Sequence, residues 1–175
     1  MPIKYEKIKD SALKDVAEFM SIAARTAPKT KGQDNLVIIM LNKTDKQKII
    51  SEMNEIAKTK NRPSCARDAK GIKNSGSIVV IGVRKKAMGL DCGFCGYPDC
   101  KSLSKTKGVC AYNSMDLGIA LGSAASIASR FHVDNRLMYS IGKAAINCGL
   151  LGKNVVQAIG IPLSATGKNP FFDRG

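Results

Sequence analysis

Tryptophan is absent from the sequence, and other aromatic residues are few. Its 175 residues include five phenylalanines and four tyrosines. Single-stranded nucleic acids are usually held by stacking bases on aromatic side chains, so few stacking platforms are available here. The sequence also contains no RNA- or DNA-binding signature. We therefore do not expect nucleic acid to be the main partner.

Acidic residues are also scarce. The chain carries 28 Lys and Arg against 14 Asp and Glu, a formal net charge of +14. Such a surface suits nucleic acid, an anionic membrane face or a small acidic protein such as a ferredoxin. Many lysines, including Lys43, Lys58 and Lys60, are scattered as expected for solvated helix faces. Of these partners we expect a redox protein, with an acidic ferredoxin as the example.

Long hydrophobic runs are missing too. The N-terminal residues are charged from the start and lack the apolar region of a secretory signal. The longest weakly apolar run, 117–129, is too short and too rich in small residues to cross a membrane. We expect a cytoplasmic protein without a membrane partner. In that reducing compartment Cys65 and Cys148 remain thiols, and clustered cysteines indicate metal binding.

Cysteine, by contrast, is concentrated in one short stretch. Four of the six cysteines follow the pattern C-x2-C-x4-C-x9-C within 91–110. A cubane iron–sulfur cluster takes one thiolate at each of four irons, so the chain must wrap around a compact anionic group. Gly93 and Gly96 allow such bending and leave backbone N–H groups free to face sulfur. The pattern predicts a [4Fe–4S] cluster on Cys92, Cys95, Cys100 and Cys110.

Zinc is the main alternative for these ligands, since four cysteines also satisfy a tetrahedral ion. Zinc sites usually combine one C-x2–4-C pair with a second such pair, whereas nine residues separate the last two cysteines here. A zinc-stabilised basic binding module for RNA or another acidic partner is the alternative function. A disulfide framework is the less favoured interpretation of these cysteines, because a chain of this length can bury a core without disulfide bonds.

Apolar spacing predicts a single α+β domain over 1–175, with the loop 91–110 inserted in it. We expect a polar connection around Arg67 and Asp68, and His132 as a cationic cap at a helix end. The helix with many small residues should lie at the centre of the fold or at a subunit interface. Predicted helices are 11–24, 44–61 (capped by Thr44), 114–131 and 134–147 (capped by Asp134), and predicted strands are 36–41, 77–83 and 154–161.

The residues from Asp91 to Cys100, with Cys110, resemble the four-iron, four-sulfur module of the corrinoid iron–sulfur protein. The chain as a whole resembles a prokaryotic family of uncharacterised proteins with a ferredoxin domain. The segments that carry this second resemblance are 24–29, 133–136 and 162–170. It implies a cluster and leaves the reaction open.

Residues 27–35 and 116–131 resemble parts of the flavin-dependent nitroreductase fold. That resemblance implies three layers, with helices around a small buried sheet, and a flavin mononucleotide (FMN) at a homodimer interface. A flavin phosphate needs cations and free N–H donors. One candidate set is Arg25, Lys29 and Lys31, for which a solvated basic turn is the alternative. The other is Ser164, Thr166, Gly167 and Lys168, for which an ordinary C-terminal turn is the alternative.

Together these observations predict an iron–sulfur redox protein for one-electron transfer. The nitroreductase resemblance adds a flavin-dependent oxidoreductase activity as an extension. The sequence offers no acid–base pair and no substrate pocket, so it identifies neither catalytic residues nor a substrate.

Overall fold

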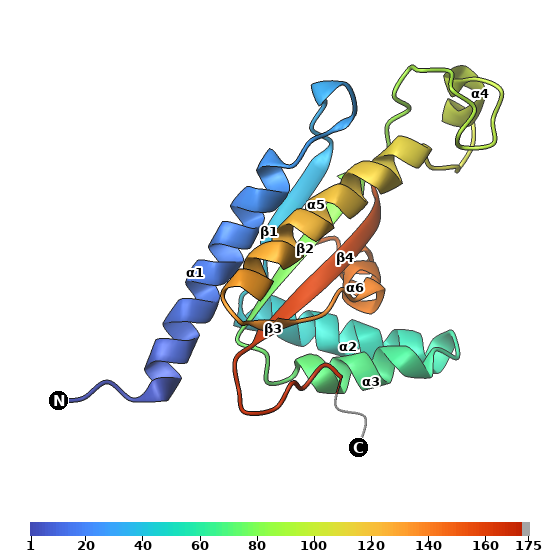
Figure 1. Cartoon of the computed structure of the whole chain (residues 1–175). Coiled ribbons are helices and arrows are strands. Elements are labelled where there is room, and N and C mark those ends of the chain that lie inside the picture. Colours follow the sequence, from blue (N-terminus) through green and yellow to red (C-terminus); the bar gives the residue numbers. More distant parts are fainter. Residues whose placement is uncertain (173–175) are drawn as a thin grey trace.

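Helices and strands alternate along the chain, as Figure 1 shows, and the mixed α+β class is confirmed. The computed structural model describes residues 1–172. A single 3₁₀ turn, Thr30–Gly32, follows the first helix. The helices are α1 (Tyr5–Thr26), α2 (Lys43–Thr59), α3 (Pro63–Ile72), α4 (Cys100–Ser104), α5 (Ala111–Arg130) and α6 (Tyr139–Asn147), and the strands are β1 (Leu36–Met40), β2 (Ser77–Arg84), β3 (Asp134–Asn135) and β4 (Val155–Ser164).

The strands form one antiparallel sheet in the order β1-β2-β4-β3. Six of the eight residues of β2 are buried, because β2 has a strand on each side and helices on both faces. Its near-continuous apolar run, Ile78–Val83, is therefore typical of a doubly covered strand. Alternate residues of β2 point to opposite faces of the sheet. Val79 and Ile81 join the core under α1 and α5, and Val80 joins the core under α2, α3 and α6.

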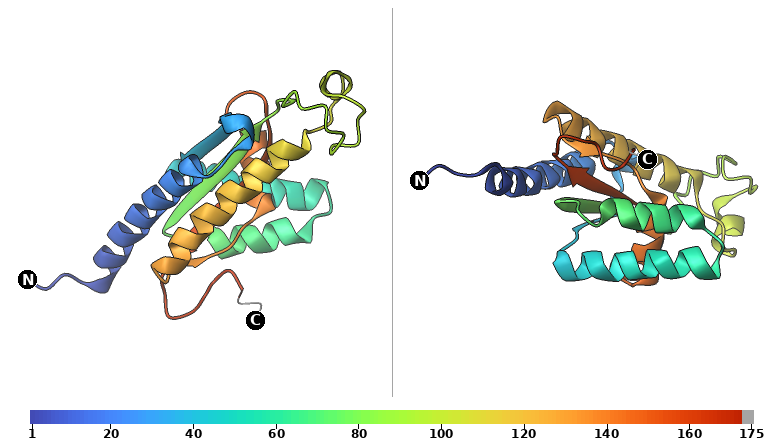
Figure 2. Two further views of the ribbon diagram at one scale, coloured as in Figure 1. Left: turned by 45° about the horizontal axis from the view of Figure 1, so that its top comes forward. Right: turned by 90° about the horizontal axis from the view of Figure 1, so that it is seen from below.

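Three layers result, as the resemblance to nitroreductases implied. Seen from below in Figure 2, α1 and α5 cover one face of the sheet, and α2 and α3 lie on the other. Leu13, Met20 and Leu121 fill the first core. Ile49 and Ile141 belong to the second. Within residues 1–172, no helix is both long enough and apolar enough to span a bilayer.

Two predictions for the segment between β1 and β2 were wrong. The expected polar connection around Arg67 is the helix α3, which begins at Pro63, because proline at the first helical position loses no hydrogen bond. The predicted cap at Thr44 is also wrong. Asn42 caps α2, with its Oδ1 accepting a hydrogen bond from Asp45 N at 2.8 Å.

The end of the chain differs as well. Asp134 does not cap a helix, because Asp134 and Asn135 form β3 and pair with β4, and α6 begins only at Tyr139. β4 continues through Pro162, which the prediction had placed beyond the strand. Because β3 is so short, residues 156–159 of β4 have no strand on their outer side within the described part of the chain.

Candidate metal centre

The four clustered cysteines lie in a separate lobe at one end of the molecule. This cysteine lobe, residues 85–110, connects β2 to α5 and projects beyond the sheet beside the start of α5 (Figure 1). It has a small core of its own, made of Met88, Leu103 and Cys110, against which Tyr97 and Tyr112 pack. The lobe therefore packs partly on itself and partly on the first turn of α5.

One pocket of the lobe is lined by Cys92, Cys95, Cys100 and Cys110. Cys110 is buried, Cys95 and Cys100 are half-buried, and Cys92 is exposed. The thiols surround this pocket without meeting at one point: in residues 1–172, no three His, Cys, Asp or Glu side chains are grouped closely enough to hold a metal ion. The structure thus brings the four predicted ligands together around one pocket.

Two glycine turns shape the loop between the first cysteines. Gly93 and Gly96 have φ of 72° and 79°, a region that glycine adopts without steric cost. Gly96 N donates a hydrogen bond to Gly93 O at 2.9 Å, which closes a tight turn around Cys95.

Asp91 fixes the position of the third cysteine. Its Oδ1 accepts a hydrogen bond from Cys100 N at 2.7 Å. Asp91 has a positive φ of 45°, which costs energy for a residue with a side chain, although Asp and Asn tolerate it best. The carboxylate therefore joins the two ends of the segment that carries Cys92 and Cys95.

Asp99 caps the short helix α4 beside it. Its Oδ1 accepts a hydrogen bond from the backbone N–H of Ser102 at 2.6 Å. This hydrogen bond stabilises the ionised carboxylate and lowers the pKa of Asp99 below its ordinary value. Asp99 thus fixes the start of the helix that carries Cys100.

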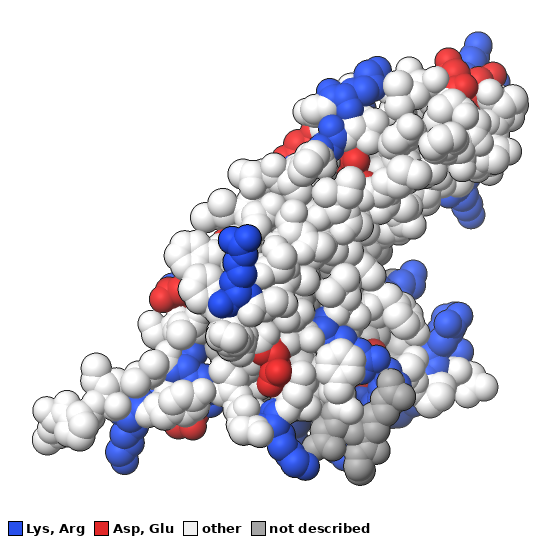
Figure 3. Space-filling view, viewed as in Figure 1, with Lys and Arg blue, Asp and Glu red and all other residues white. Residues whose placement is uncertain are grey.

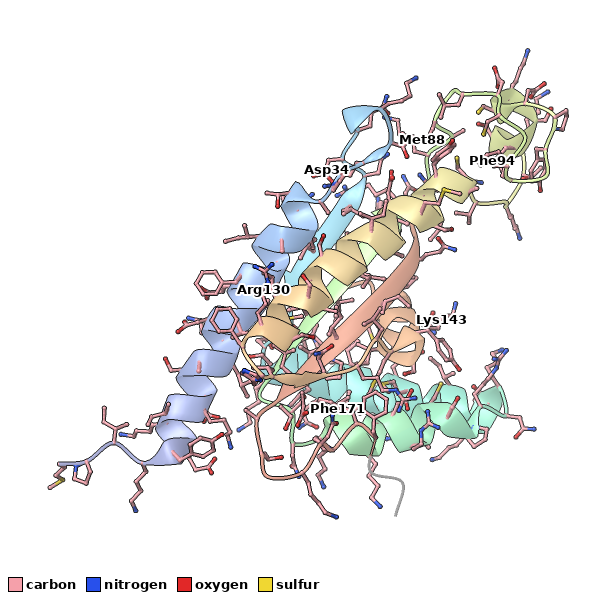
Figure 4. All side chains as sticks on the ribbon, in the orientation of Figure 1. Asp34, Met88, Phe94, Arg130, Lys143 and Phe171 are labelled. Atoms are coloured by element: carbon pink, nitrogen blue, oxygen red, sulfur yellow. The ribbon has the colours of Figure 1, made fainter. Side chains whose placement is uncertain are left out.

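An aromatic pair links the cysteine lobe to α5. The ring of Phe94 stacks on Tyr112 with centroids 5.9 Å apart and planes 14° from parallel. Phe94 nevertheless remains 67% exposed, at the outer end of the molecule (Figure 4). Sequence reasoning missed this pair, although Phe94 stands between Cys92 and Cys95 and Tyr112 follows Cys110 by two positions.

The loop after α1 lies against the cysteine lobe. Lys31 Nζ donates to Met88 O at 3.3 Å, and Asn35 Nδ2 contacts Met88 Sδ at 3.6 Å. Met88 itself lines the cysteine pocket. Figure 4 shows Asp34 and Met88 at the same end of the molecule. One candidate flavin loop is therefore a neighbour of the candidate cluster, which no local sequence pattern indicated.

The cations of that loop already have partners within it. Arg25 Nη1 lies 2.5 Å from Asp34 Oδ2 and also donates to Leu36 O. Lys29 Nζ donates to the backbone oxygens of Arg25 and Ala27. Partial burial raises the pKa of Asp34, but the hydrogen bonds from Arg25 and Leu36 N and the nearby charges of Arg25 and Lys29 together outweigh it, so the pKa is lowered overall. A phosphate would compete with these contacts.

The second candidate set lies at the opposite end of α5. Ser164 is buried at the end of β4, where it pairs with Asp134 just after α5. Thr166 Oγ1 donates to Lys168 O at 2.6 Å within the following turn. Because α5 has 20 residues, the two sets are separated by about 30 Å along its axis. One chain alone does not combine them into one site.

Two buried polar atoms near the cysteine lobe have no hydrogen-bond partner among the described residues. They are Gln33 Oε1 and Asn113 Nδ2. Asn113 is fully buried, and its Oδ1 accepts from Lys86 N at 3.1 Å. It follows Cys110 by three positions, a spacing that brings side chains together in the first turn of a helix. A buried amide donor without a described partner therefore lies in the first turn of α5, which begins just after the fourth cysteine.

The other residues singled out in the sequence either support the fold or lie at the surface. Ser140 Oγ donates to Asp68 Oδ2 at 2.6 Å, and Arg67 pairs with the other oxygen of the same carboxylate, so this group ties α3 to α6. Cys65 is a buried core residue. Burial raises the pKa of the Cys148 thiol, which is half-buried rather than fully inside. His132 lies exposed just after α5.

The arrangement of helices and strands is that of the nitroreductase fold. A nitroreductase family protein from Clostridium novyi aligns with a TM-score of 0.62 and 16% identity, over 99% of this chain and 79% of its own. A nitroreductase with bound FMN from Desulfitobacterium hafniense gives 0.61 and 16%, over 96% and 80%. The nitroreductase CinD from Lactococcus lactis in complex with chloramphenicol gives 0.64 and 12%, over 89% and 79%. These similarities define the fold.

Sequence comparison then identifies the family. The profile of uncharacterised proteins containing a ferredoxin domain (DUF2148) matches residues 106–174, a segment that includes Cys110. An uncharacterised protein of Archaeoglobus fulgidus is 37% identical over 183 residues, covering 99% of this chain and 98% of its own. The chain belongs to this family of proteins with a ferredoxin domain.

Proposed function

We propose that the protein binds a [4Fe–4S] cluster through Cys92, Cys95, Cys100 and Cys110 and transfers electrons. The observation that carries the proposal is the single pocket lined by all four thiols. Membership of a family with a ferredoxin domain supports it.

The residue types around the pocket suit such a group, although the space between the four thiols, about 10 Å³, is smaller than a cluster. Four thiolates spread around one pocket match a cluster that takes one thiolate at each iron. When bound, the cluster supplies a one-electron carrier. The chain's part is to hold the four thiolates, to exclude water from the side of Cys110, and to brace Cys100 through Asp91.

The charge of the cysteine lobe also suits electron transfer. Nearby cations stabilise the more negative, reduced form of a cluster and so raise its reduction potential. Its two carboxylates, Asp91 and Asp99, are both engaged in backbone hydrogen bonds. The lobe has more lysines than carboxylates. These lysines are Lys85, Lys86, Lys101, Lys105 and Lys107.

The test is an anaerobic absorption spectrum of the purified protein, with iron, sulfide and zinc measured on the same sample. We expect a brown protein with about four irons and four sulfides per chain. Serine in place of any of the four cysteines should lower the iron content, whereas the control Cys148→Ser should not. A colourless protein with one zinc per chain would overturn the proposal and favour the zinc-stabilised basic module.

We propose further that two chains form a homodimer through α1 and α5. Figure 3 shows a broad face over these helices with few charged residues, although the protein carries a net charge of +14. A two-fold axis across α5 would place the start of one α5 beside the end of its copy. The exposed apolar side chains of this face include Phe19, Ile22, Met115, Ile119 and Phe131.

Such a dimer would complete a flavin site. The loop with Arg25, Lys29 and Lys31 in one chain would face the turn Ser164–Lys168 of the other, and both candidate sets could hold one FMN phosphate. The bound FMN of the D. hafniense nitroreductase supports this extension. Electrons would then pass from the cluster to a flavin-dependent oxidoreductase site.

The dimer and the flavin can be tested together with one variant. We expect a mass of twice 18.7 kDa by light scattering, and tight binding of added FMN. Ile119→Glu should give a monomer that no longer binds FMN but keeps its iron, because Ile119 is exposed on α5 and lies nine positions, about 14 Å along the helix, beyond Cys110. A monomeric wild-type protein, or FMN binding unaffected by Ile119→Glu, would contradict the composite site.

The partner we propose is an acidic one-electron carrier such as a ferredoxin, attracted by the lysines of the cysteine lobe. Electrostatic steering makes association fast at low salt and slower as ionic strength rises. Electron transfer from a reduced acidic ferredoxin, followed by stopped flow, should slow with added salt. A rate independent of salt would exclude this partner.

A further inference from the structure

A second hollow, separate from the cysteine pocket, lies between α5, α6 and the outer edge of β4. Its volume is about 410 Å³. Pockets for small molecules usually measure roughly 300–1,000 Å³ and are mostly apolar. Its walls include Leu117, Leu121, Ile146 and Ile159. Figure 3 shows the outline of the molecule hollowed on this side, between the cysteine lobe and α2–α3.

Local sequence explains why this space stays open. The edge of β4 at 156–159 has no neighbouring strand within residues 1–172. Gly118 presents no side chain to the hollow, and a Cβ added there would meet nothing within 4 Å. On the other side, α6 approaches β4 so closely at Gly142 that a Cβ would lie 1.8 Å from Ala158 O. Helices α5 and α6 therefore form the sides of the hollow, and the open edge of β4 forms its base.

The polar groups at its margin are donors. Lys143 lines the hollow from α6, where Figure 4 labels it. Ser114 Oγ donates to Gln157 Oε1 at 2.7 Å, which occupies the amide oxygen and orients the NH2 group of Gln157 as a donor. No Asp or Glu lines this hollow among the described residues. A cation and an amide donor beside apolar walls suit an anionic head on a flat apolar body.

The hollow lies close to the proposed cluster. Ser114 follows Cys110 by four positions, about one helical turn or 6 Å along α5. We propose that the hollow binds a flat, apolar carboxylate, and that this is the substrate class of the redox function proposed above. The role as substrate rests on that function, whereas the binding itself does not.

The open edge of β4 could instead receive an extended peptide as an added strand. Two features favour the small molecule. Lys143 and Gln157 converge on the hollow from two different elements, and the apolar walls of α5 and α6 enclose the edge on both sides.

The test is calorimetric titration of the purified dimer or monomer, as isolated, with cinnamate and with its neutral analogue cinnamamide. The acid should bind about tenfold more tightly than the amide, the effect of one charge-assisted hydrogen bond. Lys143→Gln should remove that preference. Lys58→Gln, on the exposed side of α2, is the matched control and should leave it intact.

A pair of glycine variants tests the location. Gly118→Leu should fill the hollow and abolish binding. Gly122→Leu is the matched control, because Gly122 lies one turn further along α5, does not line the hollow, and likewise has nothing within 4 Å of an added Cβ. Equal binding of acid and amide, or unchanged binding to Gly118→Leu, would overturn the proposal. NMR shifts confined to the backbone of 156–159, without any at Lys143, would favour an added strand and also overturn it.

The same titration with iron-free protein separates this inference from the proposed function. Cinnamate binding to a chain that never acquires iron would support the hollow and contradict the cluster. A loaded cluster in a protein that binds no cinnamate would contradict the hollow alone.

Discussion

Thr30 donates two hydrogen bonds to a single oxygen of Asp116. Its backbone N lies 3.0 Å and its hydroxyl 2.8 Å from Asp116 Oδ1. Asp116 is 4% exposed, so these bonds form in a nearly dry environment. They hold the loop after α1 against the first turns of α5, next to the cysteine lobe.

Removing this carboxylate should destabilise the fold. Asp116→Ala leaves the half-buried donors of Thr30 without this acceptor, which costs about 1 kcal/mol. Denaturant unfolding of wild type and variant measures the difference. Asp15→Ala, an exposed position on α1, is the control and should change stability by less than about 0.5 kcal/mol. Equal stability of both variants would show that the Thr30 contact contributes nothing.

Loss of the Asp91 carboxylate should weaken retention of the cluster. Asp91→Ala removes the acceptor for Cys100 N and places a residue less tolerant of positive φ at that position. The visible absorbance of the cluster should decay several-fold faster on exposure to air, since one bracing hydrogen bond is lost. Asp91→Asn keeps an acceptor oxygen and tolerates the same φ, so it should decay nearly as slowly as wild type.

Gly142 should not tolerate a side chain. A Cβ at this position would lie 1.8 Å from Ala158 O, so α6 would have to move away from β4. We expect Gly142→Ala to cost about 3 kcal/mol or more in the free energy of unfolding, as for overpacked cores. Gly118→Ala, in a helix but with free space around it, should instead stabilise by up to about 1 kcal/mol. Thermal unfolding distinguishes the two, and equal melting temperatures would refute the tight contact.

The Arg25–Asp34 pair should make stability depend on pH in the acid range. Partial burial raises the pKa of Asp34, but the hydrogen bonds from Arg25 and Leu36 N, together with the charges of Arg25 and Lys29, lower it overall below the ordinary 3.8. Its contribution is therefore complete above that ordinary value and is lost as the pH falls through the lower folded pKa. Both side chains are partly exposed, so the contribution is at most about 1 kcal/mol.

Asp34→Asn should therefore be less stable than wild type at pH 7, and the two should converge at acid pH. Denaturant midpoints of the iron-free chains, measured at several pH values, test this. A constant difference at all pH values would contradict the ion pair as its cause.

Local sequence patterns predicted the parts of the fold whose determinants are local. The apolar run of β2 is buried on both faces, that of the edge strand β1 is half-buried, and the spacing of Leu13, Val16 and Met20 matches the buried side of α1. The predictions failed where tertiary contacts decide. Asp134 resembles a helix cap but pairs with Ser164, thirty residues later.

The candidate site shows the same division. Cysteine spacing is a local signal, and the four cysteines that it singled out line one pocket, while their role as ligands stays a prediction. The contacts of Met88 with Lys31 and Asn35 join segments more than fifty positions apart, and no local sequence pattern predicts such contacts. For the same reason, the sequence could not show that the two candidate flavin sets lie at opposite ends of α5.

The separate small core of the cysteine lobe has a consequence for biogenesis. Met88, Leu103 and Cys110 pack among themselves, while β2 and α5 on either side belong to the main cores. The body can therefore fold without iron, with the lobe held at both ends and Cys92 accessible at the surface. We expect newly made chains to be folded and protease-resistant before they acquire the proposed cluster. The supply of iron would then determine the fraction of chains that contain a cluster, and not the amount of folded protein.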